Sequence, residues 1–295
     1  MKQIRILLLS IVAALLVGCG TTSTVPITGR QRRLLVSDEQ VLSLSNQQYQ
    51  QYMQTAKPST NATNTAMVKR VGQRLANAVV NYLNSNGLAN EVTQYQWEFN
   101  LVQDQQVNAF CMPGGKIVVY EGLLPVTQDE TSLAIVLGHE IAHAVAKHSA
   151  EQMSKQARQQ QAVQIGGALL GMAGASQQTT SIANMASQLG FNFANLKYSR
   201  DNETEADRIG LVFAAMAGYD PNKAIEFWQR MASLSTTNQS EIFSDHPSDA
   251  TRIAALQQVI PEAMKYYKPA TTTTTKTTSK KTTTKKKTTT KKKKK

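Results

Sequence analysis

Residues 127–145 read TQDETSLAIVLGHEIAHAV, and this stretch decides the fold around it. Its apolar residues recur at helical spacing and predict one helix with a buried stripe. They are Leu133, Val136, Leu137, Ile141 and Val145. Thr127 and Glu130 stand three residues apart just before this run, and we interpret them as a capping box at the start of the helix.

Within this helix, residues 139–143 have the pattern H-E-x-x-H. At about 100° per residue, His139 and His143 project about 40° apart on one face, so both imidazoles can reach one metal ion. Glu140 lies beside them and can accept a proton from an attacking water. The pattern predicts a zinc metallopeptidase with two histidine ligands and a glutamate base.

A catalytic zinc ion needs a third protein ligand. The motif extension that would supply a third histidine is absent, because the chain has Ala146 and Ser149 at its positions. If the helix continued, His148 would project about 140° from His143, so we expect it not to reach the same metal. The third ligand is therefore expected among carboxylates of another helix.

Residues 201–217 predict that second helix. Glu203 and Asp207 share a face that continues through Gly210 and Ala214, so little side-chain bulk keeps this helix from its neighbour. We expect Glu203 at the metal and Asp207 at a ring nitrogen of a histidine. Glu205 points to nearly the opposite side and is expected to be a solvated acid.

The other elements predict an α+β fold, mostly helical, with a small sheet and hairpin beside the H-E-x-x-H helix. Further helices are expected at 37–54, 65–83, 221–234 and 248–259, a loop at 57–65, a strand at 95–102, and a hairpin of 107–111 with 116–120. The small apolar run 165–175 is either a lid, a surface-dipping loop or a buried hairpin of small residues.

The N-terminus resembles a bacterial lipoprotein signal. Lys2 and Arg5 precede the apolar run 6–17, and Leu16-Val17-Gly18-Cys19 resembles a lipobox, which predicts cleavage after residue 18 and lipidation of Cys19. The alternative is an ordinary signal with a chance cysteine. The second cysteine, Cys111, then has no partner and is expected to be a small buried apolar residue.

Almost all of the net charge of +12 comes from the C-terminus. Residues 271–295 contain eleven lysines and no acid, whereas 19–269 carries 19 basic and 20 acidic residues. The body is thus near neutral, and its net charge does not indicate a nucleic-acid-binding function. The organisation expected is a signal (1–18), a tether and N-terminal helix (19–60), a peptidase domain (61–268) and a disordered Thr/Lys tail (269–295). The tail either binds a polyanion by electrostatics (anionic lipid, another envelope polymer or nucleic acid), or only solubilises the chain as a variable extension.

Four motifs together resemble metallopeptidase family M48, which includes HtpX, BepA and LoiP. They are residues 139–143, Ser199 to Asp207, the hairpin 107–115, and His246-Pro247 with Arg252. The resemblance implies a site with one zinc ion, with His139, His143 and Glu203 as ligands and Glu140 as the base. It also implies that His246 approaches the metal, as a fourth ligand or as an oxyanion stabiliser, with Arg252 a second candidate for that last role.

The chain lacks the several spanning helices of HtpX and the helical repeats of BepA, so the lipid-anchored, LoiP-like members are the more similar ones. The resemblance implies an endopeptidase that acts on misfolded or misassembled proteins of the cell envelope. The lipobox, with Gly20 after its cysteine, is compatible with outer-membrane sorting, so we expect the chain to be anchored there and to face the periplasm. Substrate is expected to lie extended along the edge of the 107–120 hairpin. The alternative is a peptidase-like chaperone or scaffold with a polyanion-binding lysine tail.

Overall fold

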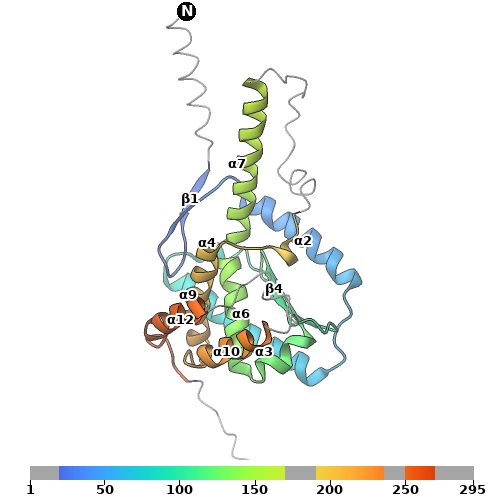
Figure 1. The fold of residues 1–295 in the computed structure, drawn as a ribbon, viewed down its shortest axis with the longest axis vertical. Helices are drawn as coiled ribbons and strands as arrows, with labels where there is room; N and C mark the ends of the chain where they lie inside the picture. The colour runs from blue at the N-terminus through green and yellow to red at the C-terminus, as the bar shows by residue number, and fades with distance from the viewer. Residues whose placement is uncertain (1–19, 170–190, 236–249, 270–295) are drawn as a thin grey trace, which may run out of the picture.

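The structure is a computed structural model that describes residues 20–169, 191–235 and 250–269. Helix α6 (Glu130–Val145) runs through its centre and is buried along nearly its whole length. In Figure 1, α6 lies between helix α9 (Arg200–Met216) on one side and the β-sheet on the other. Both neighbours contact it extensively, so α6 links the helical and β parts of the core.

Helix α6 is capped by a residue other than the predicted one. The carboxylate of Asp129 accepts a hydrogen bond of 2.7 Å from the backbone N–H of Ser132. Thr127 instead ends the preceding short helix α5 (Leu124–Thr127). The predicted capping box is therefore wrong, because a separate turn of helix takes up Thr127 before α6 begins.

The main sheet has three strands in the order β3-β5-β4. β3 (Glu98–Val102) is parallel to β5 (Lys116–Tyr120), which pairs antiparallel with β4 (Ala109–Met112) in the predicted hairpin. All residues of β4 and β5 are buried, since α6 packs on β4 and other segments cover the opposite face. β4 is an edge strand of this sheet.

The remaining helices surround this centre and confirm the α+β fold. The predicted helices all form, with small shifts at their ends, and α3 begins inside the expected loop 57–65. Besides α6 and α9 they are α2 (Asp38–Thr55), α3 (Ala62–Ser85), α10 (Lys223–Ser235) and α12 (Ala250–Ala263). Two further helices were not predicted, α4 (Ala89–Val92) and α7 (His148–Leu169), and neither were the 3-10 turns η1 (Glu121–Leu123) and η2 (Phe193–Asn195). The apolar run 165–175 lies partly in α7 and partly outside the described residues.

Helices α6 and α9 touch through two glycines. A Cβ placed on Gly138 would lie 2.7 Å from the carbonyl oxygen of Gly210, and a Cβ on Gly210 would lie 2.6 Å from the backbone nitrogen of His139. Neither distance is possible for a real side chain, so only glycine allows this contact. The predicted small-residue face of α9 is confirmed, and it brings the face of α6 that carries His139 next to Glu203 and Asp207.

The segment expected to be a tether forms a hairpin. β1 (Thr21–Thr24) pairs antiparallel with β2 (Gln31–Leu34), and β2 contacts α7. Val25, in the connecting turn, is 1% exposed and belongs to the main core. This Thr/Ser-rich segment is ordered because β2 pairs with its backbone and the core packs against Val25.

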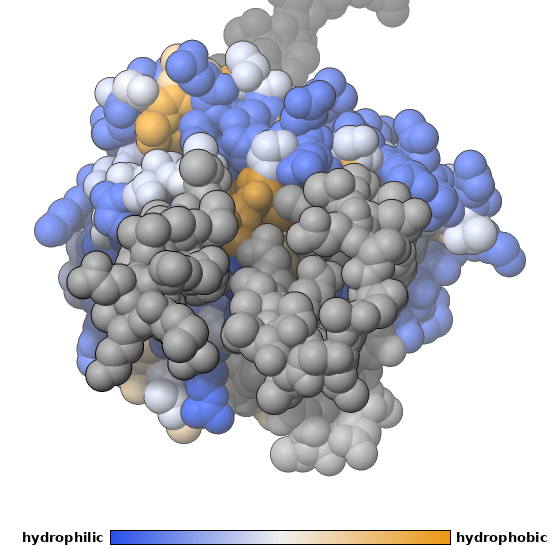
Figure 2. All heavy atoms as spheres, turned by 90° about the horizontal axis from the view of Figure 1, so that it is seen from above, coloured by the Kyte–Doolittle hydropathy of each residue, from blue (hydrophilic) through white to orange (hydrophobic). Residues whose placement is uncertain are grey.

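The described surface seen in Figure 2 is mostly hydrophilic, with small apolar areas near the centre and at the upper left of the view. Among residues 20–169, 191–235 and 250–269, no helix is both long enough and apolar enough to cross a bilayer.

We expect Gly210→Ala to destabilise the protein by about 1–3 kcal/mol, because the added methyl group overpacks the helix crossing. At an open helical position the same change would stabilise by up to about 1 kcal/mol. Urea unfolding of the two proteins measures the difference. Thr204→Ala, at an exposed position of α9, is the control and should change stability little; a stabilised Gly210→Ala variant would show that the helices can separate without cost.

Candidate metal centre

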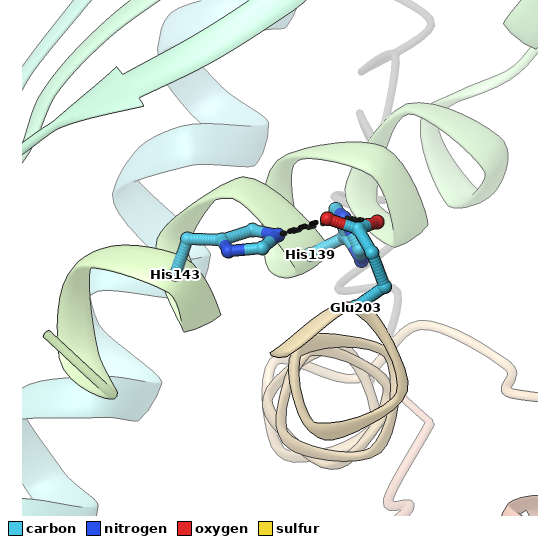
Figure 3. Close-up of side chains that lie close together, drawn as sticks. All are labelled: His139, His143 and Glu203. Carbon is cyan, nitrogen blue, oxygen red and sulfur yellow. Dashed lines mark hydrogen bonds and ion pairs between the residues drawn. The ribbon is translucent and has the colours of Figure 1, made fainter. Parts of the chain in front are cut away.

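Two side chains of α6 and one of α9 converge at the centre of the molecule (Figure 3). The Nε2 atoms of His139 and His143 lie 3.1 Å apart. The carboxylate of Glu203 reaches both rings, with Oε2 3.4 Å from Nε2 of His139 and Oε1 3.4 Å from Nε2 of His143. The three residues are 3%, 1% and 6% exposed, so the donor atoms face one another away from bulk solvent.

These distances fit a tetrahedral zinc ion. Ligand atoms about 2.0–2.1 Å from such an ion lie about 3.3 Å from each other, close to the observed separations. Two imidazoles and one carboxylate are also a known catalytic zinc donor set, which leaves a fourth position for water or substrate. The arrangement predicted from residues 139–143 and Glu203 therefore forms in space.

Glu140 lies beside this cluster and faces β4. It is 3% exposed and lines a small pocket together with Ala109 and Cys111 of the edge strand and with Tyr198. Glu140 follows the donor His139 directly in α6, and its pocket borders the edge strand. A carboxylate so placed is a candidate for the base. Cys111 is buried, as predicted, and the other cysteine of the chain, Cys19, lies outside the described residues.

Asp207 orients His139 as predicted. Its Oδ1 lies 2.9 Å from Nδ1 of His139, so Nδ1–H donates to the carboxylate and Nε2 faces the donor cluster. Burial raises the pKa of Asp207, but the charge of Arg252 and the bond to His139 outweigh it and lower the pKa.

The two histidines differ electrostatically. Burial and a nearby guanidinium lower the pKa of His139, but its bonds to Asp207 and Glu203 outweigh both and raise it to about 9. Burial lowers the pKa of His143. A metal ion at Nε2 of His139 must displace a proton, so metal binding and proton release are linked.

Arg252 holds Asp207. Its Nε and Nη2 donate to the two carboxylate oxygens at 2.8 and 2.6 Å, and the guanidinium lies 3.5 Å above the ring of Trp228. This bidentate, stacked geometry fixes the guanidinium, which is 6% exposed. The contacts support an orienting role for Arg252, which differs from the oxyanion-stabilising role expected from the sequence.

His148 lies behind His143. Helix α6 ends at Val145 and Lys147 has a left-handed backbone (φ 57), so the chain turns before His148 instead of continuing the helix. Its Nδ1 then lies 2.9 Å from Nδ1 of His143, on the side of the ring away from the donor cluster. Among the described residues, the group that could hold a metal ion does not include His148, in agreement with the expectation. The reason given for it was wrong, because the helix does not continue to residue 148 and the His148 ring lies against His143.

Glu205 is not the solvated acid that was expected. It is 9% exposed and accepts hydrogen bonds from Thr28 at 2.6 Å, from Nε of Arg30 at 2.8 Å and from Nε2 of His148 at 3.0 Å. Burial raises its pKa, but these bonds outweigh burial and lower the pKa to about 2. The helical wheel correctly turned Glu205 away from Glu203, but the N-terminal hairpin covers that side of α9.

Tyr198 contacts the site without having been predicted. Its ring stacks on the imidazole of His143, with centroids 4.0 Å apart and planes inclined by 20°. The hydroxyl lies 2.8 Å from Oγ of Ser149. A tyrosine just before a helix carries no distinctive sequence signal, so only the packing identifies it.

Two predicted site residues, Cys19 and His246, lie outside the described residues. The same holds for the signal 1–18 and for nearly all of the Thr/Lys tail.

Comparison with known proteins gives one family. A model described as Peptidase family M48 matches residues 62–260. The chain is 34% identical to the mitochondrial metalloendopeptidase OMA1 of Schizosaccharomyces pombe over 81% of its length and 66% of that protein. It is 33% identical to the human metalloendopeptidase OMA1 over 81% of its length and 46% of the relative. It is 31% identical to the beta-barrel assembly-enhancing protease of Escherichia coli over 59% of its length and 37% of the relative. The chain thus spans at most about two thirds of these proteins.

We expect Asp207→Asn to weaken zinc binding by about 10–100-fold, because the amide cannot hold His139 as the ionised carboxylate does. Competition with a chromophoric chelator measures the affinity. Asp201→Asn, at an exposed position of the same helix, is the matched control. Equal zinc affinity in Asp207→Asn and the wild type would contradict the orienting role.

Proposed function

This chain belongs to peptidase family M48, and on that premise we propose that it is a zinc-dependent metalloendopeptidase. The zinc ligands would be His139, His143 and Glu203, and Glu140 would be the catalytic base. The single observation that carries the proposal is the convergence of two imidazoles and one carboxylate at tetrahedral spacing inside the core.

Each residue has a defined part in this reaction. Bound zinc would polarise the scissile carbonyl and make the attacking water more acidic. Glu140 takes the proton of that water as it attacks and later delivers it to the leaving nitrogen. Asp207 and its partner Arg252 keep the His139 ring in the orientation that leaves Nε2 available. His246 would approach the metal or the developing oxyanion.

A peptide substrate would add to the edge strand β4. Strand addition supplies backbone hydrogen bonds and little side-chain selection, which suits an extended or unfolded chain. Support comes from the position of Glu140, which shares a pocket with Ala109 and Cys111 of that strand. A peptide bond held there lies next to both the base and the donor cluster.

The natural substrates would be misfolded or misassembled proteins of the cell envelope. A relative named for enhancing β-barrel assembly supports an envelope role. We further propose that 1–18 is a lipoprotein signal, that lipidated Cys19 anchors the chain at the outer membrane facing the periplasm, and that the Thr/Lys tail binds anionic lipid or polymer. The peptidase domain would extend to about residue 268.

We expect Glu140→Gln to lower the rate of casein hydrolysis at least about 100-fold, because the amide cannot accept the proton of water. The zinc content per chain should stay at the wild-type value. Glu39→Gln, at an exposed position of α2, is the matched control, and removal of metal with a chelator should abolish the wild-type activity until zinc is restored.

If wild type binds zinc but cleaves no faster than Glu140→Gln, the peptidase proposal fails and the chaperone or scaffold alternative gains support. Chelator-resistant cleavage would contradict the metal dependence.

We expect Cys19→Ser to move the protein from the membrane to the soluble fraction after cell lysis, because the acyl anchor is lost.

Deletion of 271–295 should lower binding to vesicles with anionic lipid and leave casein hydrolysis unchanged. Membrane retention of Cys19→Ser would contradict the anchor, and unchanged vesicle binding would contradict the role of the tail.

A further inference from the structure

We propose that the N-terminal hairpin is part of the metal centre, with Arg30 as a positioning residue that acts on His143 through Glu205 and His148. The inference rests on the proposed function, because it concerns the zinc ligand His143. It assigns a role to residues 21–34, which lie outside the family match of 62–260.

If His143 binds the metal through Nε2, the direction of the hydrogen bonds from His143 to His148 and from His148 to Glu205 is fixed. Nε2 of His143 faces Glu203 and the other ligand histidine, so a metal ligand must present its lone pair there and carry its proton on Nδ1. Only one proton fits between the two Nδ1 atoms, 2.9 Å apart, so His148 accepts at Nδ1. Its proton is then on Nε2 and points at Glu205, 3.0 Å away.

Glu205 must stay in place as a carboxylate to accept the hydrogen bond from Nε2 of His148. It is held by Arg30, whose Nε lies 3.0 and 2.8 Å from the two carboxylate oxygens and whose Nη2 lies 2.7 Å from Oε2. The same guanidinium binds Glu151 of α7 with Nη1 and Nη2, at 2.7 and 2.9 Å. Arg30 thus joins α7 and α9 behind the histidine pair.

The hairpin is itself fixed to the catalytic helix. Arg32 is 2% exposed, and its Nη1 donates to the carbonyl oxygen of Val145, the last residue of α6, at 3.2 Å. Its Nε donates to Ser23 of the paired strand at 2.8 Å. The hairpin is therefore joined to the helix that carries both histidines. The side chain of Arg30 is 39% exposed, and its position is fixed by this attachment and by its ion pairs with Glu151 and Glu205.

The two ligand histidines are supported in parallel ways. His139 donates to Asp207, which is held by the bidentate Arg252 of α12. His143 reaches its carboxylate through one intervening ring, and that carboxylate is held by Arg30. Each imidazole is thus oriented by an arginine–carboxylate pair whose arginine lies outside the α6–α9 pair.

Zinc affinity of the folded protein tests the proposal. We expect Arg30→Gln to weaken zinc binding about 10-fold or more, measured at 25 °C by competition with a chromophoric chelator. Arg33→Gln, at an exposed position of the same hairpin, should match the wild type. Circular dichroism of the metal-free variants establishes that they are folded, since a role in stability alone would lower the melting temperature and leave the zinc affinity unchanged.

Two further variants test the route through His148. His148→Phe keeps the ring shape but removes both hydrogen bonds, so it should weaken zinc binding, whereas the amide oxygen of His148→Asn can still accept from Nδ1 of His143 and should restore part of the affinity. Adding Arg30→Gln to His148→Phe should cause little further loss, because the connection is already broken.

The outcomes separate this inference from the proposed function. If wild type binds no zinc, the proposed function fails. If wild type binds one zinc ion and a folded Arg30→Gln binds it equally well, the positioning role of the hairpin is overturned and the peptidase proposal stands. If the losses of zinc affinity caused by Arg30→Gln and His148→Phe add fully in the double variant, then Arg30 does not act on His143 through His148.

Discussion

The contact between Gly138 and Gly210 is the constraint on which the rest of the structure depends. The backbones of α6 and α9 touch there, since a single methyl group on either glycine would collide with the other helix. Two of the proposed ligands come from α6 and one from α9, so the distance between these helices sets the size of the donor cluster. A catalytic ion needs ligand atoms placed to within a few tenths of an ångström, and rigid backbone contact supplies that precision.

Close helices also bring charges together in the core. Glu203, Asp207 and Glu205 are all buried on one helix, which would be costly for isolated carboxylates. Each has partners of its own: the histidine pair for Glu203, Arg252 for Asp207, and Arg30 with His148 for Glu205. The site is thus a buried ionic network supported by α12 on one side and by the N-terminal hairpin on the other.

The sequence was most informative where the spacing of residues within one helix or strand decides which side chains lie together. Periodicity and residue type predicted the α+β fold class, the β4–β5 hairpin, the convergence of His139, His143 and Glu203, and every long helix of the described residues except α7. Prediction failed where a chain end or turn intervened. Asp129 caps α6 in place of Thr127, and the left-handed Lys147 redirects the chain so that His148 returns to His143. Both depend on where a helix stops, which local spacing specifies poorly.

By itself, the sequence determined which face of α6 offers two imidazoles and which face of α9 offers Glu203 and Asp207, because helical periodicity fixes the direction of side chains within one element. Only the tertiary structure decided what lies behind those faces. Arg252 pairs with Asp207, and Glu205 is a buried carboxylate held by Arg30, 175 residues away in the chain. The physical reason is that the burial and pairing of a charge depend on which distant segment covers it, and no local pattern encodes that segment.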